Sequence, residues 1–68
     1  MNEDANQNRD RLIYNVEQLA DELSMHPDTA RQLLRNGAIK AAKMGGEWRV
    51  SREDLLEYYE RKKSQVQE

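Results

Sequence analysis

Residues 15–37, NVEQLADELSMHPDTARQLLRNG, decide the fold of this chain. Asn15 and Gln18 have the spacing of a capping box, in which each side chain accepts a hydrogen bond from the other residue's backbone N–H at the start of a helix. Apolar residues then recur with helical spacing and form one stripe of an amphipathic helix: Val16, Leu19, Ala20 and Leu23. This stretch therefore predicts a first helix with one buried face.

A second helix is predicted directly after a tight turn at residues 24–26. Pro27 suits the first position of a helix, where its missing N–H costs nothing and its fixed φ is favourable. Gly37 is expected to end the helix in a left-handed conformation. Two short helices joined by about three residues form a helix-turn-helix. The apolar stripe of the second helix is narrow: Ala30, Leu33 and Leu34.

The next stretch, AIKAAKMGGEWRV at residues 38–50, predicts two short strands around Gly45 and Gly46. We expect a three-residue loop that includes Glu47, because the hairpin then has one apolar and one cationic face. A two-residue loop would place Lys43 opposite Trp48 and mix the two faces. The longer loop carries the cost of a positive φ at Glu47. Its expected pairs are Met44 with Trp48, Lys43 with Arg49, and Ala42 with Val50.

A third helix is predicted after the hairpin, capped by Ser51 with Asp54. Its apolar side contains Leu55, Tyr58 and Tyr59, and we expect one tyrosine in the core and the other exposed. The segment 12–14 is expected either to form a brief strand or to pack beneath a helix. The fold class is therefore mainly α with a small β-hairpin, in the order helix, turn, helix, two-stranded wing, C-terminal helix: a winged helix-turn-helix.

One domain is expected at residues 12–63, with polar tails at residues 1–11 and 64–68 that cannot bury enough apolar surface to order. The 68 residues contain no cysteine, which excludes a disulfide framework and a thiol nucleophile. His26 is interpreted as a helix cap or a spacer, because no second metal ligand accompanies it. We expect no enzyme activity, cofactor or small-molecule substrate, because so short a chain encloses no large pocket. Neither a membrane span nor a signal peptide is recognised, so a cytoplasmic location is expected.

The net charge of −2 conceals an uneven distribution of charge along the chain. Residues 15–30 contain four acidic residues and no Lys or Arg, which gives −4. Residues 31–52 contain six Lys or Arg and one Glu, which gives +5. This cationic block covers the second helix and the hairpin, the two elements with which a winged helix-turn-helix touches DNA. The acidic stretches are expected on helices that face away from it.

Polar side chains off the apolar stripe of the second helix are the candidate contacts to bases and backbone. Arginine can bind guanine O6 and N7 or a phosphate, and glutamine can pair with adenine. On the wing, Lys43 and Arg49 are expected side by side, where they suit a phosphate pair or a minor-groove contact, and two glycines would let the backbone approach the duplex. The candidates are Thr29, Arg31, Gln32 and Arg35 on the helix, and Lys43, Gly45, Gly46 and Arg49 on the wing.

Four segments resemble the small winged helix-turn-helix domains of the excisionase type, which are relatives of the MerR-like regulators. These are NVEQLADEL at 15–23, HPDTARQLLRNG at 26–37, KMGGEWRV at 43–50 and SREDLLEYY at 51–59. The resemblance spans residues 14–59, about two thirds of the chain. It implies the second helix in the major groove, the wing beside the backbone or in the minor groove, and Trp48 supporting the wing from its inner face.

Two departures from the family pattern predict weaker or more cooperative DNA binding. The second helix begins with His26, Pro27 and Asp28 where the family commonly has Ser and basic residues. The wing carries Glu47 where a basic or neutral residue is usual. We therefore expect neighbouring copies, or a partner such as an integrase or another recombinase, on the same double-stranded DNA.

The leading hypothesis is a sequence-specific, non-enzymatic DNA-binding protein. Its narrower form is an excisionase-like recombination directionality factor of prokaryotic, phage or mobile-element origin that binds and bends DNA cooperatively. A small transcriptional regulator and a phage packaging-type DNA recogniser share the same fold and remain alternatives. An alternative of another class is a protein-interaction module that uses the acidic helices and does not bind DNA.

Overall fold

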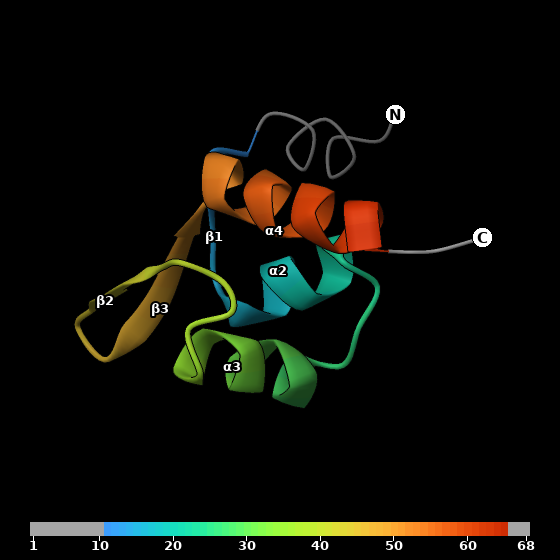
Figure 1. The fold of residues 1–68 in the computed structure, drawn as a ribbon. Coiled ribbons are helices and arrows are strands. Elements are labelled where there is room, and N and C mark those ends of the chain that lie inside the picture. The colour runs from blue at the N-terminus through green and yellow to red at the C-terminus, as the bar shows by residue number, and fades with distance from the viewer. Residues whose placement is uncertain (1–10, 66–68) are drawn as a thin grey trace, which may run out of the picture.

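The computed structural model describes residues 11–65 and has the predicted element order, with an additional strand at its start (Figure 1). The expected tail at residues 1–11 lies outside this range except for Arg11. The last helix continues to Gln65, two residues beyond the boundary expected at 63. The elements are β1 (Ile13–Tyr14), α2 (Val16–Glu22), α3 (Pro27–Arg35), β2 (Ala42–Met44), β3 (Glu47–Ser51) and α4 (Arg52–Gln65).

Each helix begins at the cap that the sequence predicts. Asn15 and Gln18 form the reciprocal capping box at the start of α2, with N···O distances of 2.8 and 2.9 Å. His26 caps α3, since its Nδ1 accepts a hydrogen bond from the Asp28 N–H at 3.0 Å. The Ser51 hydroxyl accepts from the Asp54 N–H at the start of α4. Local capping therefore fixes where the helix-turn-helix and the last helix begin.

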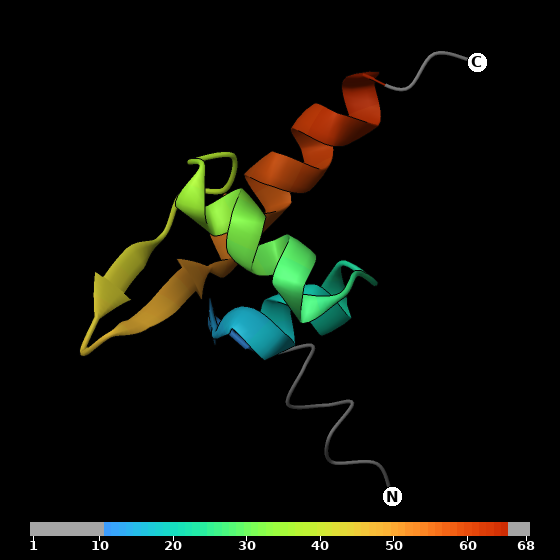
Figure 2. The ribbon, with the colours of Figure 1, turned by 90° about the horizontal axis from the view of Figure 1, so that it is seen from below.

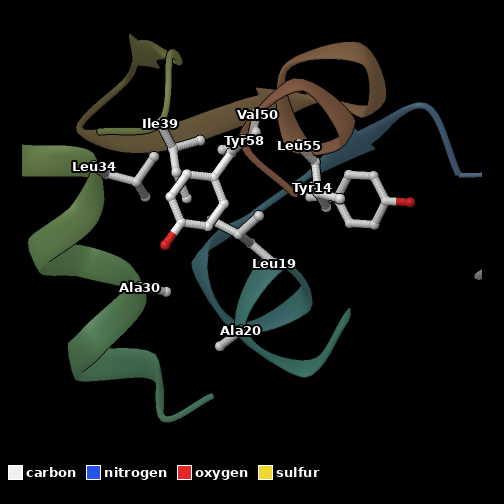
Figure 3. Close-up of a cluster of buried hydrophobic side chains, with 9 residues drawn as sticks. All are labelled: Tyr14, Leu19, Ala20, Ala30, Leu34, Ile39, Val50, Leu55 and Tyr58. Carbon is white, nitrogen blue, oxygen red and sulfur yellow. The ribbon is translucent and has the colours of Figure 1, made fainter. Parts of the chain in front are cut away.

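The core is one cluster to which every element except β2 contributes (Figure 3). Leu19, Ile39 and Val50 are its largest fully buried side chains. Tyr58 is in the core and Tyr59 is exposed, which confirms the expected division between the two tyrosines. The complete cluster is Tyr14, Leu19, Ala20, Ala30, Leu34, Ile39, Val50, Leu55 and Tyr58.

Ile39 lies in the connection between α3 and β2, because the first strand of the predicted hairpin begins only at Ala42. Gly37 adopts a φ of +82° and ends α3 as predicted. The chain then turns inward, and the N–H groups of Ala38 and Ile39 donate to the carbonyl oxygen of Leu33. This turn carries Ile39 into the core before β2 begins.

The sheet has three antiparallel strands in the order β1-β3-β2. Tyr14 pairs with Val50, and both side chains are buried. The Arg52 N–H donates to the Leu12 carbonyl oxygen at 2.8 Å, so the pairing continues to the start of α4. Segment 12–14 therefore contributes a brief strand that anchors the base of the hairpin to the helical core.

The hairpin of β2 and β3, which we term the wing, has the two-residue loop and not the expected three-residue loop. The observed pairs are Ala42 with Arg49, Lys43 with Trp48, and Met44 with Glu47, so the expected register was wrong. Gly45 and Gly46 both have positive φ, +56° and +80°, as a two-residue hairpin turn of this kind requires. The two-residue loop thus avoids a positive φ at Glu47. The strain of that conformation outweighs the cost of mixing apolar and cationic side chains on one face of the wing.

Candidate nucleic-acid interface

The polar residues of α3 divide between its outer face and the side towards the wing. Thr29, Gln32 and Arg35 are exposed, whereas Arg31 is half-buried. Arg31 and Arg35 are one turn apart, and both line a groove between α3 and the wing. Thr29 and Gln32 do not line this groove. The helix therefore presents its two arginines towards the wing, whereas Thr29 and Gln32 lie outside the groove.

The groove collects cations from two successive elements, α3 and β2. Lys43 of β2 lies on it together with Arg31 and Arg35 of α3. Figures 1 and 2 show the wing projecting away from the helices beside α3. Residues of both elements line the groove. The full lining is Asn15, Val16, Glu17, Arg31, Arg35, Lys43, Gly46, Glu47 and Trp48.

Lys43 and Arg49 do not form the expected pair on one face of the wing. The observed register places Lys43 opposite Trp48, whereas Arg49 shares the other face with Glu47. The Lys43 Nζ lies over the Trp48 ring, 4.8 Å from its centroid, so the mixed pairing gains a cation–π contact. Trp48 is half-buried against the core and supports the wing from its inner side, as expected. Only Lys43 of the two wing cations faces the groove.

Two of the four candidate cations are held in ion pairs by the acidic residues that depart from the family pattern. The Arg31 guanidinium lies 3.2 Å from the Asp28 carboxylate. The Arg49 guanidinium lies 2.8 Å from the Glu47 carboxylate. Among the described residues, Arg35 forms no such ion pair. The positive charge of the interface is thus partly neutralised within the protein.

The structure brings together only part of the cationic block of residues 31–52. Lys40 is exposed in the connection before β2 and is not part of the groove. Arg52 lies on the β1 side, where its guanidinium donates to the Arg11 carbonyl oxygen at 3.3 Å. The net charge summed over residues 31–52 therefore overstates the positive charge that the groove between α3 and the wing contains.

The sequence did not indicate that the start of α2 borders the groove. Asn15, Val16 and Glu17 all line it, so the expectation that the acidic residues of this helix face away was wrong for Glu17. Nothing in the local sequence relates Glu17 to the wing, because only the packing of the helices brings them together. In contrast, the spacing of three residues between Asp28 and Arg31 is itself a signal for an ion pair on a helix.

Residues 11–65, the part of the chain that the structure describes, contain neither a metal-site cluster nor a membrane-spanning helix. No group of His, Cys, Asp or Glu residues in this range has the arrangement of a metal site. None of the helices within it has the length and apolar character needed to cross a membrane.

Comparison with known proteins agrees with this architecture. Residues 13–63 match the sequence profile of a family described as a helix-turn-helix domain. This match covers every element of the structure from β1 to most of α4. No curated protein and no solved structure matches the chain significantly.

Proposed function

The chain belongs to the helix-turn-helix domain family, a family of DNA-binding domains, and we propose that it recognises a specific duplex sequence through α3 and the wing. The observation that carries this proposal is the convergence of Arg31, Arg35 and Lys43 on one groove. Cations from separate elements that meet in a groove are the electrostatic footprint of nucleic-acid binding.

The groove suits one sugar-phosphate strand of the duplex. A recognition helix in the major groove and a wing in the neighbouring minor groove have the intervening phosphate strand between them. In this protein that position corresponds to the groove between α3 and the wing, with its three cations. We therefore assign phosphate contacts to Arg31 and Lys43, and a place at the edge of the groove to Arg35.

Base recognition is assigned to Thr29 and Gln32, which lie on α3 outside the groove, and to Arg35 at its edge. Gln32 is exposed and can pair with adenine through its amide, and Thr29 can contact a base or the backbone. Arg35 is exposed and free of an ion pair among the described residues, so it can reach either guanine or a phosphate. Gly45 and Gly46, at the tip of the wing, let its backbone lie close to the duplex. Arg49 is assigned a backbone contact on the outer face of the wing.

Selection of bound duplexes from a random pool tests sequence recognition. We expect one sequence to be enriched, and Gln32→Ala to reduce its preference over random DNA by about 1–3 kcal/mol. Lys43→Ala should weaken binding to all sequences by similar factors, since a phosphate contact carries no sequence information. Specific recognition would be contradicted if no sequence is enriched and the protein binds every duplex in the pool with the same affinity.

Within DNA binding, we propose the role of an excisionase-like recombination directionality factor, which binds neighbouring sites, bends DNA and acts with an integrase. The four sequence segments that resemble the excisionase type support this narrower role. The moderate number of cations on the groove also favours cooperation between copies over tight binding at a single site.

A reconstituted recombination assay separates this role from that of a transcriptional regulator. If an integrase gene neighbours this one, addition of the protein should increase excision by that integrase and decrease integration. A regulator would leave both reactions unchanged and alter transcription from the promoter next to its selected site.

A further inference from the structure

We infer that Asp28 and Glu47 attenuate the DNA affinity of this protein by neutralising Arg31 and Arg49 on the binding surface. This inference rests on the proposed function and concerns the strength of binding that the same surface provides. Neither acidic residue is needed to contact DNA, and the inference gives both of them a role in setting the affinity.

The geometry places each carboxylate where it competes with a phosphate. Asp28 lies in the first turn of α3, and its carboxylate is 3.2 Å from the Arg31 guanidinium that borders the groove. Glu47 borders the groove, and on the outer face of the wing its carboxylate is 2.8 Å from the Arg49 guanidinium. A phosphate that approaches either guanidinium must displace a carboxylate or share the cation with it.

Both pairs are accessible enough to exchange partners. The Asp28 and Glu47 side chains are 79% and 66% exposed, so water and salt screen their attraction to the arginines. Exchange leaves an unpaired carboxylate close to DNA, where it repels the phosphate backbone. Each acidic residue thereby subtracts about one unit of charge from the surface that meets the duplex.

The same ion pairs would have the opposite effect if they served to orient the arginines for DNA. In that case removal of either carboxylate would release the guanidinium and weaken binding. The exposure of both carboxylates argues against this alternative, since exposed pairs restrain long side chains only weakly. The direction of the change in affinity separates the two roles.

The test uses Asp28→Asn, Glu47→Gln and the double variant, with Glu60→Gln as the matched control. Glu60 also forms an ion pair at spacing i,i+3, with Lys63 at 3.5 Å, but it lies on α4. Figure 1 shows α3 and α4 on opposite sides of α2, so the control changes the net charge equally without altering the groove. The full chain is titrated with a random-sequence duplex at several salt concentrations, and circular dichroism verifies that each variant is folded.

We expect each interface variant to bind random duplex about fivefold more tightly at 50 mM salt, the effect of one unit charge at contact distance. The slope of log K against log salt should steepen by about 0.9 for each carboxylate removed. Glu60→Gln should change the affinity and the salt slope by less than half as much as the interface variants do.

Two outcomes would overturn the inference. Affinity in the interface variants that matches Glu60→Gln would show that the two carboxylates lie outside the electrostatic reach of DNA. Weaker binding in folded Asp28→Asn and Glu47→Gln proteins would show that the ion pairs orient the arginines. Absence of binding by the wild type and all variants at low salt would instead contradict the proposed function itself, so the two failures are distinguishable.

Discussion

The candidate interface and the second half of α4 use the same kinds of side chain in different arrangements. On α4, Arg61 pairs with Glu57 and Lys63 pairs with Glu60, while Arg61, Lys62 and Lys63 lie near the rings of the two tyrosines. At the interface, Arg31 and Arg49 have acidic partners and Lys43 lies over Trp48. Ion pairs and cation–π contacts therefore occur in both regions.

The difference lies in how many elements supply the charges. The cations near the end of α4 belong to a single helix, whereas the cations of the groove come from two elements, α3 and β2. Cations from separated elements can surround a phosphate strand, which a single row on one helix cannot do. Convergence of cations on a groove, and not the presence of charge, therefore distinguishes the proposed binding surface from a solvated helix.

The largest expected effect concerns the structural role of α4. Tyr58 is 8% exposed and Tyr59 is 48% exposed. Tyr58→Ala should lower the free energy of unfolding by about 3 kcal/mol, because it leaves a cavity in the core. Tyr59→Ala should lower it by less than about 1 kcal/mol. Urea denaturation followed by circular dichroism measures both; equal losses would show that α4 does not pack through one face.

The next effect compares cations in the two regions directly. Arg35→Ala with Lys43→Ala removes two cations from the groove, and Lys62→Ala with Lys63→Ala removes two from α4. The groove variant should lose about 2 kcal/mol of binding free energy for random duplex at low salt. The α4 variant should lose less than about 0.5 kcal/mol. Fluorescence anisotropy measures both affinities, and equal losses would remove the distinction between the regions.

A smaller effect is expected at the turn that sets the register of the wing. Gly45 has a φ of +56°, and an added Cβ would meet no atom within 4 Å. Gly45→Ala should therefore cost about 1 kcal/mol of stability through backbone strain alone. Gly45→Asn should cost less, since asparagine adopts this conformation more readily. Thermal unfolding of the two variants checks the order, and a more stable alanine variant would contradict the turn geometry.

The smallest effect lies in the turn between α2 and α3, away from the wing. Ser24 adopts a φ of +56°, which a residue with a Cβ rarely does. Ser24→Gly should raise the free energy of unfolding by about 0.5 kcal/mol, because relief of strain exceeds the added entropy of the unfolded chain. The salt dependence of DNA binding should not change. Lower stability in urea would show that the Ser24 side chain contributes more than its backbone costs.

The helices and their caps could be predicted from the sequence because the signals are local. Asn15 with Gln18, Pro27 after His26, and Ser51 with Asp54 each act within a few residues. The hairpin register could not be predicted from the segregation of faces, since the conformational freedom of the two glycines outweighed it.

The candidate interface was predictable in its elements but not in its arrangement. The cationic block pointed to α3 and the wing, and Arg31, Arg35 and Lys43 of these elements line one groove. The positions of Arg49 and Glu17 relative to the groove depend on strand register and helix packing, which local spacing does not encode.

The salt dependence of binding to a random duplex tests the central claim most directly. If the groove between α3 and the wing holds a phosphate strand, affinity should fall steeply between 50 and 200 mM salt, by about threefold for each phosphate contact. The Arg31→Ala, Lys43→Ala double variant, which removes the two assigned phosphate contacts, should show a slope shallower by about 2 than the wild type. Equal slopes for the two proteins would contradict the assignment of the groove to the DNA backbone.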